Sequence, residues 1–188
     1  GVAPGRSGAA AVDARLDARL DARTVRTKLG VVGLAISFDL NWPRLWVAMK
    51  RDGAQIACWL SGCPGGLPLR MRALASELPI VTSVQGTRAA KYIDAAGRVR
   101  CATSRWQRMA LVDVNVHQRL VHTDGSHVAL RGAPARDSLL ALQRACGESA
   151  TVSALDEEHF ALIEWHGESS KVARTSNMFE DPIEIIRG

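Results

Sequence analysis

The sequence lacks the features that mark membrane proteins and nucleic-acid-binding proteins. None of its segments reaches the roughly 18 consecutive apolar residues of a membrane helix, and its alanine-rich beginning has no hydrophobic signal core. Aromatic residues make up only 5% of the chain, and no compact basic run is interleaved with them. We therefore expect a cytoplasmic protein that binds neither a membrane nor a nucleic acid.

Cysteine is also sparse, and its spacing shows no metal-binding pattern. The four cysteines form no CxxC pair, so free thiols in a reducing compartment are the expected state. His117, His122 and His127 recur at a spacing of five, which matches neither a helix face nor a strand face. We expect solvated histidines near a strand end, and we predict no metal and no cofactor.

The first 26 residues differ in texture from the rest of the chain. The stretch "VDARLDARLDART" repeats a four-residue unit, which places like charges at i and i+4 and gives no helix-stabilising ion pairs. Two leucines are too narrow an apolar stripe for a stable isolated helix. We predict that residues 1–26 form a low-complexity, poorly ordered arm, with a functional tail as the alternative.

From Thr27 onward, strand patterns and helix patterns alternate, which is typical of an α/β layer structure. "DAAG" separates two short extended runs and predicts a hairpin in which Gly97 takes a positive φ. The predicted strands are 29–37, 54–61, 78–84 and 109–116, and the predicted helices are 43–53 and 68–77. With 188 residues and 47% apolar content, the chain is long enough for one well-packed core.

Residues 131–188 are expected to form a helical extension and a tail. Both "ARDSLLALQRACG" (135–147) and "SALDEEHFALIEWHG" (153–167) predict helices, since each has a capping residue, Asp137 and Ser153 respectively, and ends at a glycine. The acidic end "FEDPIEIIRG" carries isoleucines on a short segment and is a candidate oligomer contact.

The stretch "GLAISFDLNWPR" (33–44) predicts a buried strand that ends in a polar elbow before a helix opened by proline. Such an elbow can expose a nucleophile, which makes Ser37 the candidate. Its flanks, Ala35 and Asp39, do not match the GxSxG pattern of serine hydrolases. A rebuilt serine-histidine site that uses one of the three histidines remains an alternative.

Five stretches in this order resemble the carbon-nitrogen hydrolase family, the nitrilase and amidase superfamily. The elbow stretch is similar to the family's G-x-x-I-C-Y-D-x-x-F-P-E, and "RMRALAS" is similar to its R-A-R-A-x-E-N. The other three are "DGAQIACWLSG", "IDAAGRVRCAT" and "RMALVDVNV". The resemblance covers residues 27 to about 120 and corresponds to the C-terminal half of the family's domain.

The resemblance implies a partial αββα sandwich with one mixed sheet and helices on one face, formed by a half-domain at 27–130. It places Ser37 at the position of the family's catalytic cysteine. It also implies that Phe38, Asp39 and Trp42 bind the substrate, a small amide or nitrile.

Two departures from the family pattern predict weak or absent activity. A serine hydroxyl stays protonated near neutral pH, whereas a thiol yields useful thiolate. The family's Glu and Lys lie upstream of the nucleophile, but no glutamate precedes Glu77 here, and the only upstream lysine is Lys28. We expect a hydrolase that is impaired by itself, with another chain as a source of the two groups, or else a non-catalytic scaffold or binding subunit. Either form would expose apolar sheet surface, which predicts a homo-oligomer or a partner chain.

Overall fold

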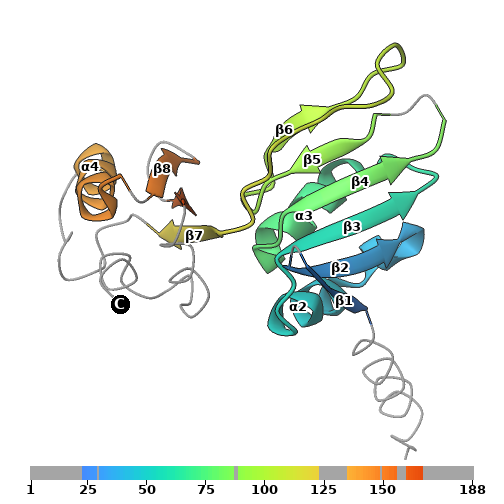
Figure 1. The fold of residues 1–188 in the computed structure, drawn as a ribbon, viewed down its shortest axis with the longest axis horizontal. Helices are drawn as coiled ribbons and strands as arrows, with labels where there is room; N and C mark the ends of the chain where they lie inside the picture. The colour runs from blue at the N-terminus through green and yellow to red at the C-terminus, as the bar shows by residue number, and fades with distance from the viewer. Residues whose placement is uncertain are drawn as a thin grey trace, which may run out of the picture.

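The computed structural model describes residues 23–28, 30–86, 89–122, 135–148, 150–155 and 160–166, which form two sheets (Figure 1). The first unit contains β1 (Thr24–Thr27), β2 (Gly30–Ile36), the 3-10 helix η1 (Ser37–Asn41), α2 (Pro43–Arg51), β3 (Ile56–Ser61), α3 (Gly66–Ser76), β4 (Ile80–Val84), β5 (Lys91–Ile93) and β6 (Val99–Ala102). The second contains β7 (Gln118–His122), α4 (Ala135–Cys146), β8 (Ala150–Ala154) and β9 (Phe160–Trp165).

The first sheet is mixed, with its six strands in the order β1-β2-β3-β4-β5-β6. β2, β3 and β4 run parallel because α2 and α3 carry the chain back between them. β1 pairs antiparallel with β2, and the β5–β6 hairpin continues the sheet from β4. The expected α/β fold with one mixed sheet is confirmed. Residues 1–22 of the predicted arm lie outside the described residues, whereas Thr24 to Arg26 are part of β1.

The main core lies between this sheet and its two helices. Inward positions of the strands pack against the apolar sides of α2 and α3, and the buried set is Ala35, Leu45, Trp46, Met49, Ala54, Ala57, Trp59, Leu69, Ala73, Leu78, Ile80 and Ile93. Gly33 permits this packing, since a Cβ there would lie 2.6 Å from the sulfur of Met49. Burying these side chains on one face is the main source of the unit's stability.

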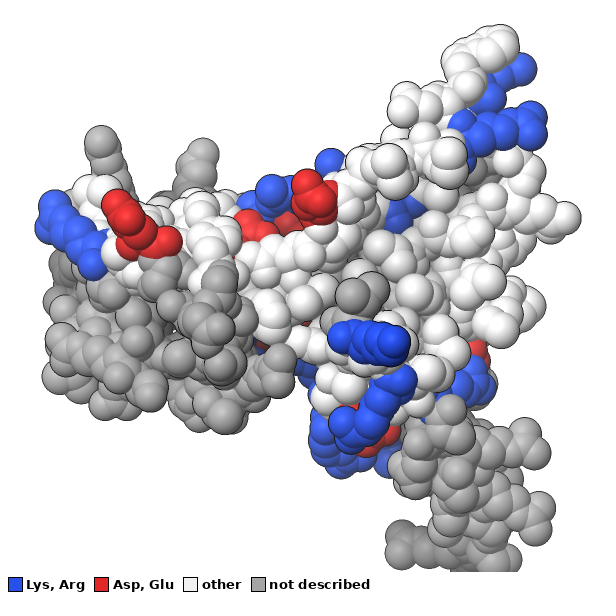
Figure 2. Space-filling model, viewed as in Figure 1, with Lys and Arg blue, Asp and Glu red and all other residues white. Residues whose placement is uncertain are grey.

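The opposite face of the first sheet presents apolar side chains to the solvent. The alternation along β2 points Leu34 and Ile36 away from the helices, and Leu60 of β3 lies opposite Ile36 in the ladder. All three are exposed, as is Val25 of β1. Few charged side chains lie over β2 to β4 in Figure 2. The helices therefore cover one face of this sheet, and the other is open in the described part of the chain.

The predicted strand at 109–116 is wrong, because this segment forms no strand pairing in the structure. Met109 and Leu111 are strongly exposed, with Leu111 at 96%. The segment leads instead to β7, which begins at Gln118 and pairs with β9. An alternating pattern needs a neighbouring strand to become a strand, and this segment has none in the described structure.

The predicted helix at 153–167 is also wrong. These residues contribute to β8 and β9, and β9 is the central strand of the second sheet, with β7 on one side and β8 on the other. Because β9 has a strand on each side, three consecutive residues, Ala161, Leu162 and Ile163, are buried. Consecutive burial is typical of a central strand, whereas a surface helix buries residues three and four apart. The helix predicted at 135–147 is confirmed as α4, and Gly147 takes a positive φ at its end. The isoleucine-bearing tail lies outside the described residues.

Candidate functional site

Ser37 lies at the carboxyl end of β2, at the first residue of η1. Its φ of 47° is in the left-handed region, which only Ser37 and Glu77 occupy among the described residues other than glycine. A side chain in this region costs free energy, so surrounding contacts must hold it there. The indole Nε1 of Trp59 donates a hydrogen bond of 3.2 Å to the carbonyl oxygen of Ser37. The structure therefore contains the elbow that the sequence pattern predicts.

Asp39 holds the elbow from within. Its carboxylate accepts a hydrogen bond of 2.8 Å from the backbone nitrogen of Ile36 and forms an ion pair with Arg23. Its carbonyl oxygen accepts hydrogen bonds of 3.1 Å from the backbone nitrogen of Trp42 and from Nε1 of Trp46. The carboxylate of Asp39 is therefore engaged in positioning the turn, and substrate binding by Asp39 stays a prediction.

Phe38 and Trp42 lie on the outside of the elbow, 79% and 52% exposed. On the open sheet face, Ile36 at the end of β2 and its ladder partner Leu60 are exposed as well. The rim of the elbow is therefore apolar. It can contact an apolar substituent of a substrate, although substrate binding by Phe38 and Trp42 stays a prediction.

The carboxyl ends of β2, β3 and β4 meet at one edge because the three strands are parallel. In such sheets this edge is the usual place for a ligand. The loop after β3 brings Cys63 there, exposed, with its backbone nitrogen donating to Oγ of Ser61 at 2.9 Å. In the sequence, Cys63 stands in the glycine-rich turn "SGCPGG" and is one of the four cysteines expected to be free thiols. Its place on the same edge as Ser37 comes from the parallel pairing of β2 and β3.

Lys50 and Glu77, the first lysine and glutamate after the elbow, lie at the opposite edge of the sheet. Lys50 is in the last turn of α2, and its Nζ donates a hydrogen bond of 2.7 Å to the carbonyl oxygen of Glu77. The Glu77 carboxylate accepts from the backbone nitrogen of Leu120 at 3.3 Å and lies 3.7 Å from Nη1 of Arg119. Both side chains are therefore committed away from Ser37.

The two described histidines of the three candidates lie away from the elbow. His117 lines a pocket at the amino edge of the sheet, and His122 pairs with Phe160 in the second sheet. His127 lies outside the described residues. Within the described ranges, no three His, Cys, Asp or Glu side chains gather closely enough to hold a metal ion. None of the described helices combines the length and the apolar character needed to cross a membrane.

Sequence reasoning missed two residues that shape the elbow. As an aromatic in a predicted strand, Trp59 is expected in the core or at an interface, with no role at the elbow. Arg23 lies inside the low-complexity repeat, where nothing in the local pattern distinguishes it. Both act through partners distant in sequence, since Trp59 is 22 residues from Ser37 and Arg23 is 16 residues from Asp39. Only the pairing of β1, β2 and β3 brings them to the elbow.

No family model matches the chain, and no curated protein matches it. Solved structures similar to it belong to the nitrilase superfamily. Nit3 of Saccharomyces cerevisiae, a member of branch 10 of that superfamily, is 20% identical over 44% of this chain and 36% of that chain, with a TM-score of 0.41. A variant of the Nesterenkonia AN1 amidase is 15% identical over 43% and 36%, with a TM-score of 0.39. The carbon-nitrogen hydrolase of Helicobacter pylori G27 is 18% identical over 44% and 39%, with a TM-score of 0.38. The chain therefore spans well under half the length of these proteins.

Proposed function

We propose that this chain presents the nucleophile elbow of a nitrilase-like carbon-nitrogen hydrolase, with Ser37 in the catalytic cysteine's position and weak or no turnover by itself. The observation that carries the proposal is the left-handed backbone of Ser37 at the carboxyl end of β2, which pairs in parallel with β3. A residue held there by hydrogen bonds on both sides of the turn is costly to maintain, and such positions cluster at active sites.

In the proposed reaction the Ser37 hydroxyl adds to the carbon of an amide or nitrile and gives up its proton to the substrate nitrogen. With an amide, the C–N bond then breaks and ammonia or an amine leaves, so that an ester acyl-enzyme remains. With a nitrile, the adduct is an imidate, which one water converts to the same ester with release of ammonia. A further water hydrolyses the ester to the carboxylic acid and restores the Ser37 hydroxyl.

A hydroxyl needs a positioned base for the first addition, because it stays protonated near neutral pH. The nearest carboxylate in sequence, that of Asp39, is engaged by Arg23 and Ile36. Glu77 and Lys50 contact each other at the far edge. These contacts support an impaired hydrolase, and a second chain that supplies a base belongs to the same proposal.

Phe38 and Trp42 are the proposed substrate contacts on the outer rim of the elbow. Asp39 is the third proposed contact, because it lies in the same turn as Ser37. Because the rim is apolar, an amide or nitrile with an apolar substituent is the substrate class that it favours. Cytoplasmic location and the absence of a nucleic-acid partner stay predictions from composition.

The test compares amide and nitrile hydrolysis by the native chain, Ser37→Ala and Ser37→Cys. Ser83→Ala and Ser83→Cys are matched controls, since Ser83 is an exposed serine on β4 of the same sheet. We expect native turnover near background, and we expect Ser37→Cys to react faster with a thiol-directed haloacetamide than Ser83→Cys does. Robust native turnover that survives Ser37→Ala would refute the assignment of Ser37. Equal labelling rates of Ser37→Cys and Ser83→Cys would show that the elbow does not activate a nucleophile at position 37.

The alternative is a non-catalytic scaffold or binding subunit, and the open apolar sheet face favours it. A homo-oligomer or a partner chain would cover Leu34, Ile36 and Leu60. Light scattering of the native chain, Leu34→Arg and Val47→Arg tests this, because Val47 is equally apolar but exposed on α2. Association lost in Leu34→Arg and retained in Val47→Arg supports the scaffold. A native chain that is monomeric at high concentration contradicts it.

A further inference from the structure

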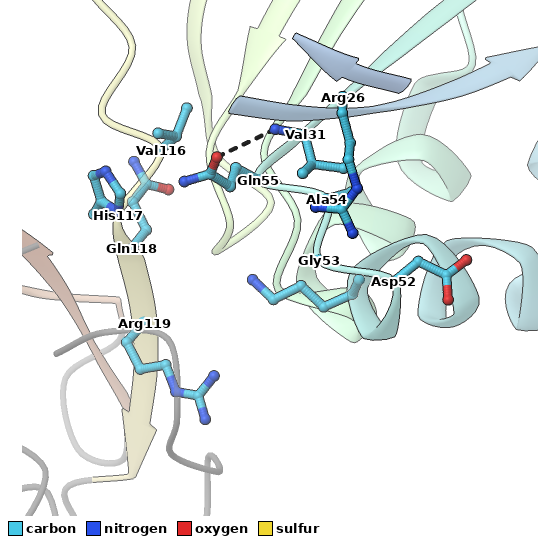
Figure 3. Close-up of a pocket in the computed structure, with 11 residues that line it drawn as sticks. Arg26, Val31, Asp52, Gly53, Ala54, Gln55, Val116, His117, Gln118 and Arg119 are labelled. Atoms are coloured by element: carbon cyan, nitrogen blue, oxygen red, sulfur yellow. Dashed lines mark hydrogen bonds between the residues drawn. The ribbon is translucent and has the colours of Figure 1, made fainter. Parts of the chain in front are cut away.

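A pocket lies at the amino edge of the first sheet, opposite the elbow. It has a volume of about 290 Å³ and is bounded by the end of α2, the amino ends of β2 and β3, and the segment that enters β7 (Figure 3). Three of the side chains that line it are cationic, namely Arg26, Lys50 and Arg119. The cations come from β1, α2 and β7, so the fold brings them together from distant parts of the sequence.

Arg119 is the buried group of this pocket. Its side chain is only 9% exposed, and its Nε is buried without a hydrogen-bond partner among the described residues. The nearest carboxylate, that of Glu77, lies 3.7 Å from Nη1, which is beyond a good hydrogen bond, and it already accepts from the backbone nitrogen of Leu120. A buried guanidinium with an unsatisfied donor is costly, and an acceptor in the pocket would remove that cost.

Lys50 is a second, half-buried cation. Its ammonium group donates to the carbonyl oxygen of Glu77, which leaves donor capacity for another acceptor. Burial lowers the pKa of Lys50, the Glu77 carboxylate raises it, and the Arg119 charge lowers it. An anion beside both cations would offset the desolvation and the repulsion together.

The remaining charges do not neutralise the pocket. Arg26 adds a third cation from the exposed edge strand. Figure 3 shows the guanidinium of Arg119 directed toward the end of α2, and the carboxylate of Asp52 directed away from the gap between Arg119 and Gln55. Among the described residues, Glu77 is then the one carboxylate that forms an ion pair with any of the three cations, and its partner is Arg119.

We propose that this pocket binds a small oxyanion, a phosphate or carboxylate group, between Lys50 and Arg119. The planar fork of an arginine fits either group, and an ammonium beside it adds a point charge. The volume is at the lower end of the range for ligand pockets, which leaves room for a small organic part attached to the anion. Because Arg119 belongs to the second sheet and Lys50 to the first unit, the bound anion would also hold the two together.

Isothermal titration of the purified full chain with inorganic phosphate, and separately with acetate, tests the proposal. We expect saturable one-site binding of at least one of the two. Arg119→Gln and Arg26→Gln should each weaken it about tenfold or more, since each removes a charged donor. Arg51→Gln is the matched control. Arg51 follows Lys50 in the last turn of α2, but its side chain is exposed and does not line the pocket. Binding of phosphate alone would identify the site as a phosphate site. Binding of both phosphate and acetate would identify it as a general oxyanion site.

Two results would overturn the proposal. One is the absence of saturable binding of either anion to the native chain. The other is an equal loss in Arg51→Gln and Arg26→Gln, which would mean that only net charge matters. If Arg119→Gln fails to fold, the comparison of Arg26→Gln with Arg51→Gln still decides, because both residues are at the surface. The titration does not involve hydrolysis, so its outcome is independent of the proposed function.

Discussion

The indole nitrogen of Trp59 donates a hydrogen bond of 3.2 Å to the carbonyl oxygen of Ser37, and so joins β3 to the strained turn that follows β2. Trp59 is buried in the main core between the sheet and its helices. A core residue therefore holds the backbone of the candidate nucleophile. The contact links the packing of the fold directly to the geometry of the elbow.

Replacing Ser37 by glycine should stabilise the protein. Glycine adopts a positive φ without the steric cost of a Cβ, so Ser37→Gly should raise the free energy of unfolding by about 1 kcal/mol. Urea titration followed by circular dichroism measures the change. Ser83→Gly in the regular strand β4 is the control and should lower stability instead. A Ser37→Gly protein less stable than the native one would show that the side chain contributes more than its strain costs.

Removing the carboxylate of Asp39 should loosen the elbow. Asp39→Ala leaves the backbone nitrogen of Ile36 and the side chain of Arg23 without their acceptor, which should cost about 1 to 3 kcal/mol. Asp113→Ala, at an exposed position, should change stability by less than about 0.5 kcal/mol. Chemical denaturation compares the two. Equal effects would mean that Asp39 does not brace the turn.

The β5–β6 hairpin should not tolerate a side chain at Gly97. Its φ is +74°, and an added Cβ would lie 2.7 Å from the carbonyl oxygen of Arg70, so Gly97→Ala combines backbone strain with a clash. We expect a loss of roughly 2 to 4 kcal/mol. Gly53→Ala isolates the strain, because Gly53 also has a positive φ but no atom within 4 Å of the added Cβ. Thermal unfolding should therefore show a clearly smaller loss for Gly53→Ala.

The cysteines should differ strongly in their reactivity toward alkylating reagents. Burial raises the pKa of Cys146 to about 11, so the reactive thiolate is scarce until the pH approaches that value. Cys63 is exposed. At pH 8, mass spectrometry after brief iodoacetamide treatment should find Cys63 labelled and Cys146 unlabelled, and labelling of Cys146 should rise with pH. Cys63→Ser controls for the assignment. Rapid labelling of Cys146 at pH 8 in the folded chain would contradict its burial.

Local sequence patterns correctly predicted the elements whose residues show clear periodicity or turn chemistry. The apolar runs before the elbow and before the glycine-rich turn became β2 and β3, and the helix opened by Pro43 became α2. Gly97 takes the positive φ that its hairpin predicts. Each of these depends on residues within one element and its immediate flanks, where side-chain periodicity and turn chemistry act directly.

The failures occurred where a distant partner decides the structure. Residues 160–165 have apolar spacing compatible with a helix, but pairing with β7 and β8 makes them a central strand. Residues 109–116 alternate like a strand but have no described strand to pair with. Local propensity is weak enough that such tertiary contacts override it.

By itself, the sequence determined the α/β order of the first unit and placed Ser37 at a turn between a strand and a helix, because both follow from short-range periodicity. It predicted a buried strand there, whereas β2 is buried on one face only and exposes Leu34 and Ile36 on the other. Only the tertiary structure decided which groups meet. It set Trp59 against Ser37, paired Lys50 with Glu77 far from the elbow, and brought Arg119 beside Lys50. These contacts join residues separated by many positions, and they form only when strand pairing and burial bring distant segments together.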